Sequence, residues 1–456
     1  MFNFGNKEMI LMELHEMSAK ELSKLIADKK IGVEELTRCY LGRIYKYDGH
    51  DGLNSIVELN ENIISEAKKL DDTKNRTGDM FGLPILVKDN IDVAGMHTTA
   101  GSLALEDNIV VKDAHIIENL RKNGALILGK TNMTEFANFT SYEMKNGYSS
   151  RGGQVKNAYI REKESGGSST GSAVAMSAGF CAAAIGTDTN FSIVGCATEN
   201  GVTGLKPAYG SLSTKGILPI SHTLDMVGPI TRDLSDGILT YSCMRDTKLP
   251  QINPMSPKNI KLAVNIYDKE EVSDAQLKRY ENLYSKLSGD GVSLDEITNP
   301  GSDSIGDIMI YEFNHDVDEY LRDSKSKYKK LSEILKFYEN NPKTMMKYGC
   351  DILKKAIENA SGKLNEKEYL DALNERNKLR EALISDISKY DAVILSGLSN
   401  IMNFVGFPSI AIRLCMAHDE TPRSVILYGV DEKRLFEAGL LLENYCPPLG
   451  IPNLEK

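Results

Sequence analysis

The stretch that most constrains this chain is SGGSSTGSAVAMSAGFCAAAIGTDTNFS, at residues 165–192. It opens on a glycine- and serine-rich segment, and residues 172–186 are almost all small and apolar. A Gly/Ser run alone is typical of a linker or turn. A linker, however, has no reason to lead into a segment whose composition predicts deep burial. A glycine-rich loop that enters a buried helix presents backbone N–H groups, which can bind developing negative charge. We therefore expect this stretch to lie beside a functional site.

The patterns around this stretch alternate between strands and helices. FGLPILVKDNI (81–91) and ALILGKTNM (125–133) are typical of buried strands, and AHIIENLRKNG (114–124) between them has helical spacing. This alternation favours an α/β layer arrangement. Earlier in the chain, Ser18 and Glu21 form a capping-box pattern, and Gly32 separates two predicted helices.

The rest of the chain suggests one domain with a helical excursion. Residues 265–390 are rich in Lys, Glu, Leu and Tyr at helical spacing, and YDAVILSG and PSIAIRLC return to strand patterns. We predict a single domain over 1–456, which comprises N-terminal helices (12–72), a core (80–245), the helical region (265–390), and C-terminal strands and a helix (391–456).

Composition excludes several classes of protein. The 456 residues carry a net charge of −10 with both signs intermixed, which argues against a nucleic-acid surface. Neither a run approaching 18 apolar residues nor a leader with a cleavage site is present, so we expect a cytoplasmic protein without membrane association. The seven cysteines are scattered without a CxxC pair, which predicts free thiols in a reducing compartment.

Two further residues could take part in a chemical reaction. Lys88 ends the buried-strand pattern Ile85-Leu86-Val87, and desolvation there would lower its pKa enough for it to act as a neutral base. Ser192 needs such a base before it can act as a nucleophile. His222 and Asp225 allow an alternative Ser-His-Asp arrangement, but that hypothesis leaves the serine-rich loop and Lys88 unexplained.

These residues stand within motifs that resemble the amidase-signature family, serine hydrolases that cleave carboxamides with a Ser-Ser-Lys triad. The similarity covers nearly the whole chain, and NMTEFANF, RGGQ and SIV favour the peptide amidase branch over tRNA amidotransferase subunits. The matching segments are GLPILVKDNIDVAGMHTTAGS (82–102), KTNMTEFANF (130–139), RGGQVKN (151–157), SGGSSTGSA (165–173), GTDT (186–189) and NGVTGLKPAYGSLSTKGILPISHTLDMVGPITRDLSD (200–236).

The resemblance implies a three-layer α/β/α sandwich with a large mixed sheet. It also implies Ser192 as nucleophile, Lys88 as base and Ser168 as the bridging serine, which in the family follows a cis peptide bond. The resemblance further implies an oxyanion hole from the backbone N–H groups of Thr189, Asn190 and Phe191, with support from Ser169, Thr187 and Asp188. The implied substrate is a small or peptidyl amide, with no metal or cofactor, and a homodimer is compatible with the sequence.

Two departures from the family pattern leave alternatives open. Asn190-Phe191 stands where the family has glycine before the nucleophile, and Gly195-Cys196 stands where it has a cysteine or another residue followed by proline. Phe191 either keeps its N–H aimed and narrows the pocket, or the loop refolds and loses an oxyanion donor. Val194 leaves no arginine for an anionic substrate. The hypotheses are therefore an amidase, a catalytically weak relative, and the transamidation subunit of a tRNA-dependent amidotransferase.

Overall fold

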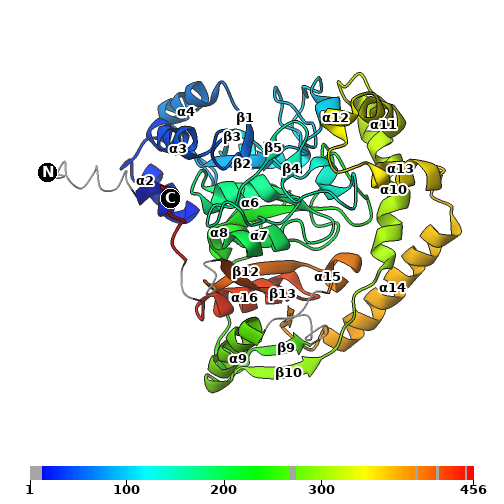
Figure 1. Cartoon of the computed structure of the whole chain (residues 1–456). Coiled ribbons are helices and arrows are strands. Elements are labelled where there is room, and N and C mark those ends of the chain that lie inside the picture. Colours follow the sequence, from blue (N-terminus) through cyan, green and yellow to red (C-terminus); the bar gives the residue numbers. More distant parts are fainter. Residues whose placement is uncertain (1–12, 267–273, 396–398, 417–420, 447–448, 456) are drawn as a thin grey trace.

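A large mixed β-sheet runs through the molecule, with helices on both of its faces (Figure 1). The computed structural model describes residues 13–266, 274–395, 399–416, 421–446 and 449–455. In spatial order the strands are β1 (Ile56–Leu59), β3 (Leu126–Thr131), β2 (Pro84–Lys88), β6 (Ala183–Asp188), β8 (Met226–Thr231), β7 (Thr203–Lys206), β12 (Ser409–Met416), β13 (Pro422–Tyr428), β11 (Ala392–Leu395), β9 (Lys261–Asn265) and β10 (Ser293–Ile297). A separate hairpin pairs β4 (Tyr148–Ser149) with β5 (Gly153–Gln154).

The strands that matter most for function are parallel neighbours. β2 lies between β3 and β6 and pairs parallel with both, whereas β8, β7, β12 and β13 pair antiparallel. All residues of β2, β3 and β6 are buried, as expected for parallel strands covered on both faces. The carboxyl ends of these three strands therefore meet at one edge of the sheet.

The two faces of the sheet carry different helices. Helices α6 (Thr170–Ser177) and α7 (Val194–Asn200) pack on one face, and α8 (Leu234–Met244) and α16 (Glu432–Glu443) pack on the other. Along β12, Ala411 belongs to the core around α6 and α7, while Ile410 and Ile412 belong to the core around α16. This alternation follows the two-residue period of a strand. The predicted α/β architecture of a large mixed sheet flanked by helices is confirmed.

The remaining helices frame this centre. The capping box at Ser18 and Glu21 is confirmed at the start of α2 (Ala19–Ala27). Gly32 lies between α2 and α3 (Val33–Tyr47), so it separates two helices as predicted, and it is the N-cap of α3. The other elements are η1 (Leu14–Glu16), α2 (Ala19–Ala27), α3 (Val33–Tyr47), α4 (Ile63–Asp72), η2 (Leu103–Leu105), α5 (His115–Lys122), η3 (Glu135–Asn138), η4 (Pro257–Asn259), α9 (Asp274–Gly289), α10 (Ser304–Asp323), α11 (Leu331–Asn340), α12 (Pro342–Met345), α13 (Asp351–Asn359), α14 (Lys367–Ile387) and α15 (Ile401–Phe404). None of the helices in the described ranges has the length and apolar character needed to cross a bilayer.

Two sequence expectations need refinement. The region predicted to be helical, 265–390, also contains β10, which pairs parallel with β9 at the edge of the sheet. Figure 1 shows α10 to α14 gathered along one side of the molecule rather than spread over a sheet face. The small apolar run is buried as predicted, but it divides at Gly179 (φ 69°) into helix α6 and strand β6.

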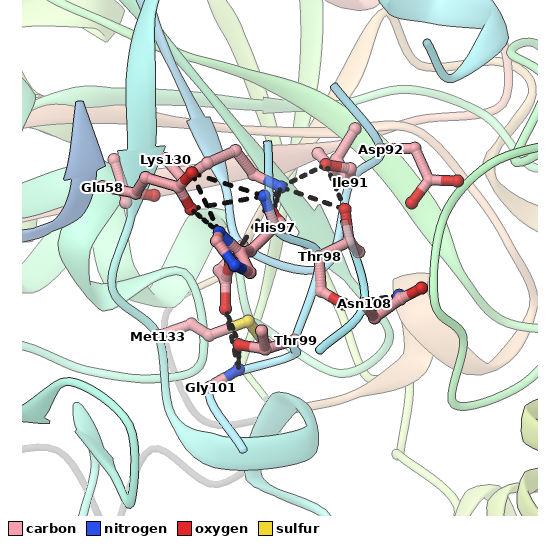
Figure 2. Close-up of polar contacts among 12 residues, drawn as sticks. Glu58, Ile91, Asp92, His97, Thr98, Thr99, Gly101, Asn108, Lys130 and Met133 are labelled. Carbon is pink, nitrogen blue, oxygen red and sulfur yellow. Dashed lines mark hydrogen bonds and ion pairs between the residues drawn. The ribbon is translucent and has the colours of Figure 1, made fainter. Parts of the chain in front are cut away.

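A second buried lysine holds the loop that follows β2. Lys130 on β3 is fully buried, and its Nζ donates to the carbonyl oxygens of Ile91 and His97, both at 2.7 Å (Figure 2). It also donates to Thr98 Oγ1 at 3.2 Å and lies 3.9 Å from Asp89 Oδ1. In the register of β2 and β3, Val87 pairs with Lys130 and Lys88 with Thr131. The two lysines therefore point to opposite faces of the sheet.

We predict that Lys130→Met lowers the free energy of unfolding by about 3 kcal/mol, because it leaves two buried carbonyl oxygens without their donor and removes one of the two cations beside buried Asp89, the other being Arg151 at 3.1 Å. Urea denaturation measures this change. Lys68→Met is the matched control, since the Lys68 side chain is 57% exposed and its ion-pair partner among the described residues is Glu34, at 3.7 Å on the surface. This substitution should change stability by about 0.5 kcal/mol or less. Equal effects of the two substitutions would contradict a stabilising role for the buried ammonium.

Candidate active site

Lys88, the last residue of β2, faces the end of the neighbouring strand β6. Val87 pairs with Ile185, so Thr187 and Asp188, the last two residues of β6, lie near the Lys88 side chain. Crevices at the carboxyl ends of parallel strands are the usual ligand sites of α/β sheets. Parallel pairing thus brings together residues that are separated by about a hundred positions.

The serine-rich loop that leads into α6 reaches the same strand ends. Ser169 is the N-cap of α6, Ser168 precedes it, and the peptide bond between Gly167 and Ser168 is cis. Ser169 packs directly over Gly186 of β6, where an added Cβ would lie 2.8 Å from Ser169 Oγ. Gly186 thereby permits the close approach that places both serines against the strand ends.

An unbroken series of short contacts joins Lys88 to Ser192. Lys88 Nζ lies 2.9 Å from Ser168 Oγ, and Ser168 Oγ lies 3.1 Å from Ser192 Oγ. Lys88 Nζ also lies 2.9 Å from Ser169 Oγ and 2.8 Å from Thr187 Oγ1. The structure therefore brings together all three residues of the implied triad and two of the supporting ones.

The Lys88 ammonium has lost its water without gaining a carboxylate. Its side chain is fully buried, and among the described residues it forms no ion pair. Burial lowers the pKa of Lys88 to about 8, although Cys196, Asp188 and Asp225 oppose the shift. A protonated Lys88 donates to Ser168, which in turn donates to Ser192. Once Lys88 is neutral it can accept, and the direction of the series can reverse.

Asp188 holds the loop that carries Ser192. Its Oδ2 accepts from the backbone N–H of Ile193 at 2.6 Å and of Val194 at 3.3 Å, at the start of α7. Its Oδ1 accepts from Asn403 Nδ2 at 2.7 Å, and Asn403 lies on α15. Two segments more than 200 residues apart thus position Ser192.

Three backbone donors beside Ser192 remain available. Within the described ranges, no protein atom accepts a hydrogen bond from the N–H groups of Thr189, Asn190 and Phe191. The Thr189 side chain is held separately, because its Oγ1 donates to Asp225 Oδ1 at 2.6 Å. Unpaired N–H groups next to a serine hydroxyl suit the stabilisation of an oxyanion.

The alternative Ser-His-Asp arrangement does not occur. His222 Nδ1 lies 2.9 Å from Asp316 Oδ1, and its Nε2 lies 3.3 Å from Glu312 Oε1. Asp225 instead binds Thr189 and accepts from the backbone N–H groups of residues 220 and 221. No hydrogen bond among the described residues links His222 to Asp225 or to Ser192, so this hypothesis was wrong.

Sequence reasoning missed several residues that position the site. Asn90 Nδ2 donates to Thr187 Oγ1 at 3.2 Å. Lys206 is buried, and its Nζ donates to the carbonyl oxygen of Phe407 at 2.5 Å, beyond the end of α15, which carries Asn403. Asn90 stands only two positions after Lys88, and this proximity in the sequence could have identified it as a site residue. No sequence pattern marks Asn403.

Comparison with known proteins agrees with this geometry. The sequence model described as "Amidase" matches residues 35–399. The chain belongs to the amidase family. The chain is 36% identical over 306 residues to a glutamyl-tRNA(Gln) amidotransferase subunit of Exiguobacterium sibiricum, a match that covers 64% of this chain and 62% of that subunit.

Other relatives match over almost their whole length. A probable amidase of Arabidopsis thaliana is 28% identical over 466 residues, which cover 94% of this chain and 90% of the plant protein. The crystal structure of peptide amidase from Stenotrophomonas maltophilia superposes with a TM-score of 0.88 at 26% identity, covering 97% of this chain and 99% of that one.

The departure at Phe191 is accommodated by the departure at Gly195. Phe191 keeps the left-handed backbone (φ 64°) that glycine adopts readily, and its carbonyl accepts from the Gly195 N–H at 2.8 Å. A Cβ added at Gly195 would lie 3.3 Å from Phe191 Cβ. The absence of a side chain at 195 therefore makes room for the phenylalanine.

The two neighbouring departures lie in the core. Burial raises the pKa of Cys196 to about 12, so it stays a neutral thiol, and the seven cysteines, all within the described ranges, form no disulfide with one another, as predicted. Val194 is also fully buried. Packing accounts for both side chains.

We predict that Phe191 and Gly195 are energetically coupled. Gly195→Ala should destabilise the wild-type protein, because the new methyl group crowds Phe191 Cβ. In a Phe191→Gly background the same change should be neutral or stabilising by up to about 1 kcal/mol, as expected for alanine in a helix. Urea denaturation of the four proteins gives the coupling energy, which we expect to be about 1 kcal/mol. The same effect of Gly195→Ala in both backgrounds would contradict the coupling.

Proposed function

We propose that the protein hydrolyses a carboxamide to a carboxylate and ammonia or an amine, through an acyl-enzyme on Ser192. The observation that carries this proposal is the series of contacts from buried Lys88 through Ser168 to Ser192, at 2.9 and 3.1 Å. Membership of the amidase family supports it. The resemblance to peptide amidase supports a small or peptidyl amide as substrate.

In the acylation step, neutral Lys88 accepts the proton of Ser168 while Ser168 accepts that of Ser192. Ser192 Oγ then bonds to the amide carbon, and the carbonyl oxygen becomes an oxyanion next to the N–H groups of Thr189, Asn190 and Phe191. The C–N bond breaks as Ser168, resupplied by Lys88, returns a proton to the leaving nitrogen. Acyl-Ser192 and free ammonia or amine result.

In the deacylation step, water takes the place of the amine. The same series of groups removes its proton, and the hydroxide bonds to the acyl carbon. The ester bond to Ser192 breaks, and Ser192 Oγ regains the proton that the series removed from water. The carboxylic acid leaves and ionises to carboxylate in solution, where its proton passes to solvent or to the released amine. Lys88 ends each cycle neutral, so the site needs no external acid or base.

The state of Phe191 favours an active site over an inert one. Its positive φ keeps the loop in the conformation that glycine would give, and its N–H has no acceptor within the described residues. Phe191 is half-buried and next to Ser192, which is 6% exposed. We infer that the ring narrows the approach to Ser192 without removing the donors.

A second candidate function rests on the relative of 36% identity, which is one subunit of a tRNA amidotransferase. In that case the chain would transfer ammonia only with partner subunits. Size-exclusion chromatography with light scattering, followed by an ammonia assay on the same fraction, separates the two. Activity of the isolated chain favours the hydrolase, whereas activity that appears only in a heteromeric complex favours the amidotransferase.

We predict that purified protein releases ammonia from primary carboxamides and that Ser192→Ala lowers kcat by at least about 10⁴-fold. A sulfonyl fluoride or activated phosphonate should form one adduct, located on Ser192 by mass spectrometry. Ser177→Ala, at the other end of α6, is the control and should retain activity. Equal ammonia release by wild type and Ser192→Ala would contradict the proposal.

We also predict a pH profile set by Lys88. Its pKa of about 8 means that Lys88 is mostly protonated below that pH and cannot accept the relayed proton. For a primary amide that does not titrate, kcat/KM should rise about tenfold per pH unit towards 8 and level off above it. Circular dichroism over the same pH range is the control that checks whether the fold is unchanged. A profile already flat at pH 6 would exclude Lys88 as the base.

A further inference from the structure

Two histidines and a carboxylate converge outside the candidate active site. His222 lies in the loop between β7 and β8, and His315 and Asp316 lie next to each other on α10. One ligand atom from each of the three lies within 4.8 Å of the others. His222 Nδ1 and His315 Nδ1 are each 2.9 Å from the same atom, Asp316 Oδ1. Both rings therefore converge on one oxygen.

The charge around this cluster suits a divalent cation. Asp316 is 6% exposed and Glu312 is fully buried, and Glu312 Oε1 lies 3.3 Å from His222 Nε2. In the described part of the chain, the ion-pair partners of these carboxylates are the two histidines, with no lysine or arginine among them. Two buried carboxylates thus face two imidazoles that are neutral when they bind a metal.

Two of the three ligand–ligand distances are close to those of a zinc site, and the third is within 4.8 Å. Ligands on a tetrahedral zinc with bonds of about 2.0–2.1 Å stand about 3.3 Å apart. The 2.9 Å contacts from His222 and His315 to Asp316 need to open by only a few tenths of an ångström once the shared protons leave. The His222 and His315 side chains are 49% and 35% exposed, so an ion can reach them from solvent.

Neighbouring groups hold the ligands in place. Asp316 Oδ2 accepts from the His222 backbone N–H at 2.6 Å, and the Tyr209 hydroxyl donates to the His222 carbonyl at 3.0 Å. Thr223 N donates to Glu312 Oε2 at 3.0 Å. Such supporting contacts orient the ligands of protein metal sites.

We propose that His222, His315 and Asp316 form a binding site for Zn²⁺, with a water molecule at the fourth position. The ion connects the loop at 222 to α10. The same loop contains Asp225, three residues after His222, and the Thr189 hydroxyl beside Ser192 donates to Asp225 at 2.6 Å, so one hydrogen bond joins the loop that holds His222 to the loop that carries the serine. Amide hydrolysis at Ser192 does not require the ion, and the two proposals fail independently.

Isothermal titration of the chelator-treated full-length protein with zinc chloride tests the site. We expect one ion per chain, and about a tenfold or greater loss of affinity in His222→Ala and in His315→Ala. His115→Ala is the matched control, because His115 also lies between two carboxylates, Asp246 and Glu118, but belongs to no cluster of three possible metal ligands among the described residues. Zinc should also raise the melting temperature of wild type but not of His315→Ala.

Histidine ring NMR identifies the ligands in the wild-type protein, independently of whether a variant folds. Added zinc should shift the ring signals of His222 and His315 and leave that of His115 in place. Wild-type affinity no greater than that of His222→Ala/His315→Ala, or shifts confined to other histidines, would overturn the proposal.

Discussion

The site depends on a lysine buried among neutral oxygen atoms. Lys88 Nζ is surrounded by the hydroxyls of Ser168, Ser169 and Thr187, and no carboxylate pairs with it in the described structure. The hydroxyls accept hydrogen bonds from the ammonium, but they do not offset the free-energy cost of removing the charged form from water. Lys130, one strand away on the other face, has Asp89 at 3.9 Å. The same residue type therefore lies among neutral hydroxyls on one face, where we propose a chemical role, and beside a carboxylate on the other.

Segments that are far apart in the sequence bury Lys88 and position Ser192. The loop that leads into α6 supplies Ser168 and Ser169 from one face of the sheet, and the carboxyl end of β6 supplies Thr187 and Asp188. The C-terminal α15 reaches Asp188 through Asn403. Because Asp188 also binds the first N–H groups of α7, a change near residue 403 acts on the loop that carries Ser192. The geometry at Ser192 thus depends on contacts between segments that lie far apart in the sequence.

Much of the site could be predicted from the sequence, for local reasons. Lys88 ends a recognisable buried strand, and Ser168 and Ser192 stand in motifs whose order and spacing are characteristic. The contact of Asn403 with Asp188 escaped prediction, because a long-range pairing leaves no local pattern. β10 was missed because SLDEI is short and rich in charge. The outcome at Phe191 stayed open until the space above Gly195 was known, since crowding between two side chains is a property of three-dimensional packing.

The central claim is that Lys88 is neutral at a pH where most lysines are charged. Carbon-13 NMR of protein labelled at the lysine Cε positions measures this directly, and the signal absent from Lys88→Met assigns the residue. That assignment is essential, because burial also lowers the pKa of Lys206 to about 8. A Lys88 signal that titrates near pH 8 agrees with the account. A Lys88 signal that titrates near 10.4, the ordinary lysine value, contradicts it.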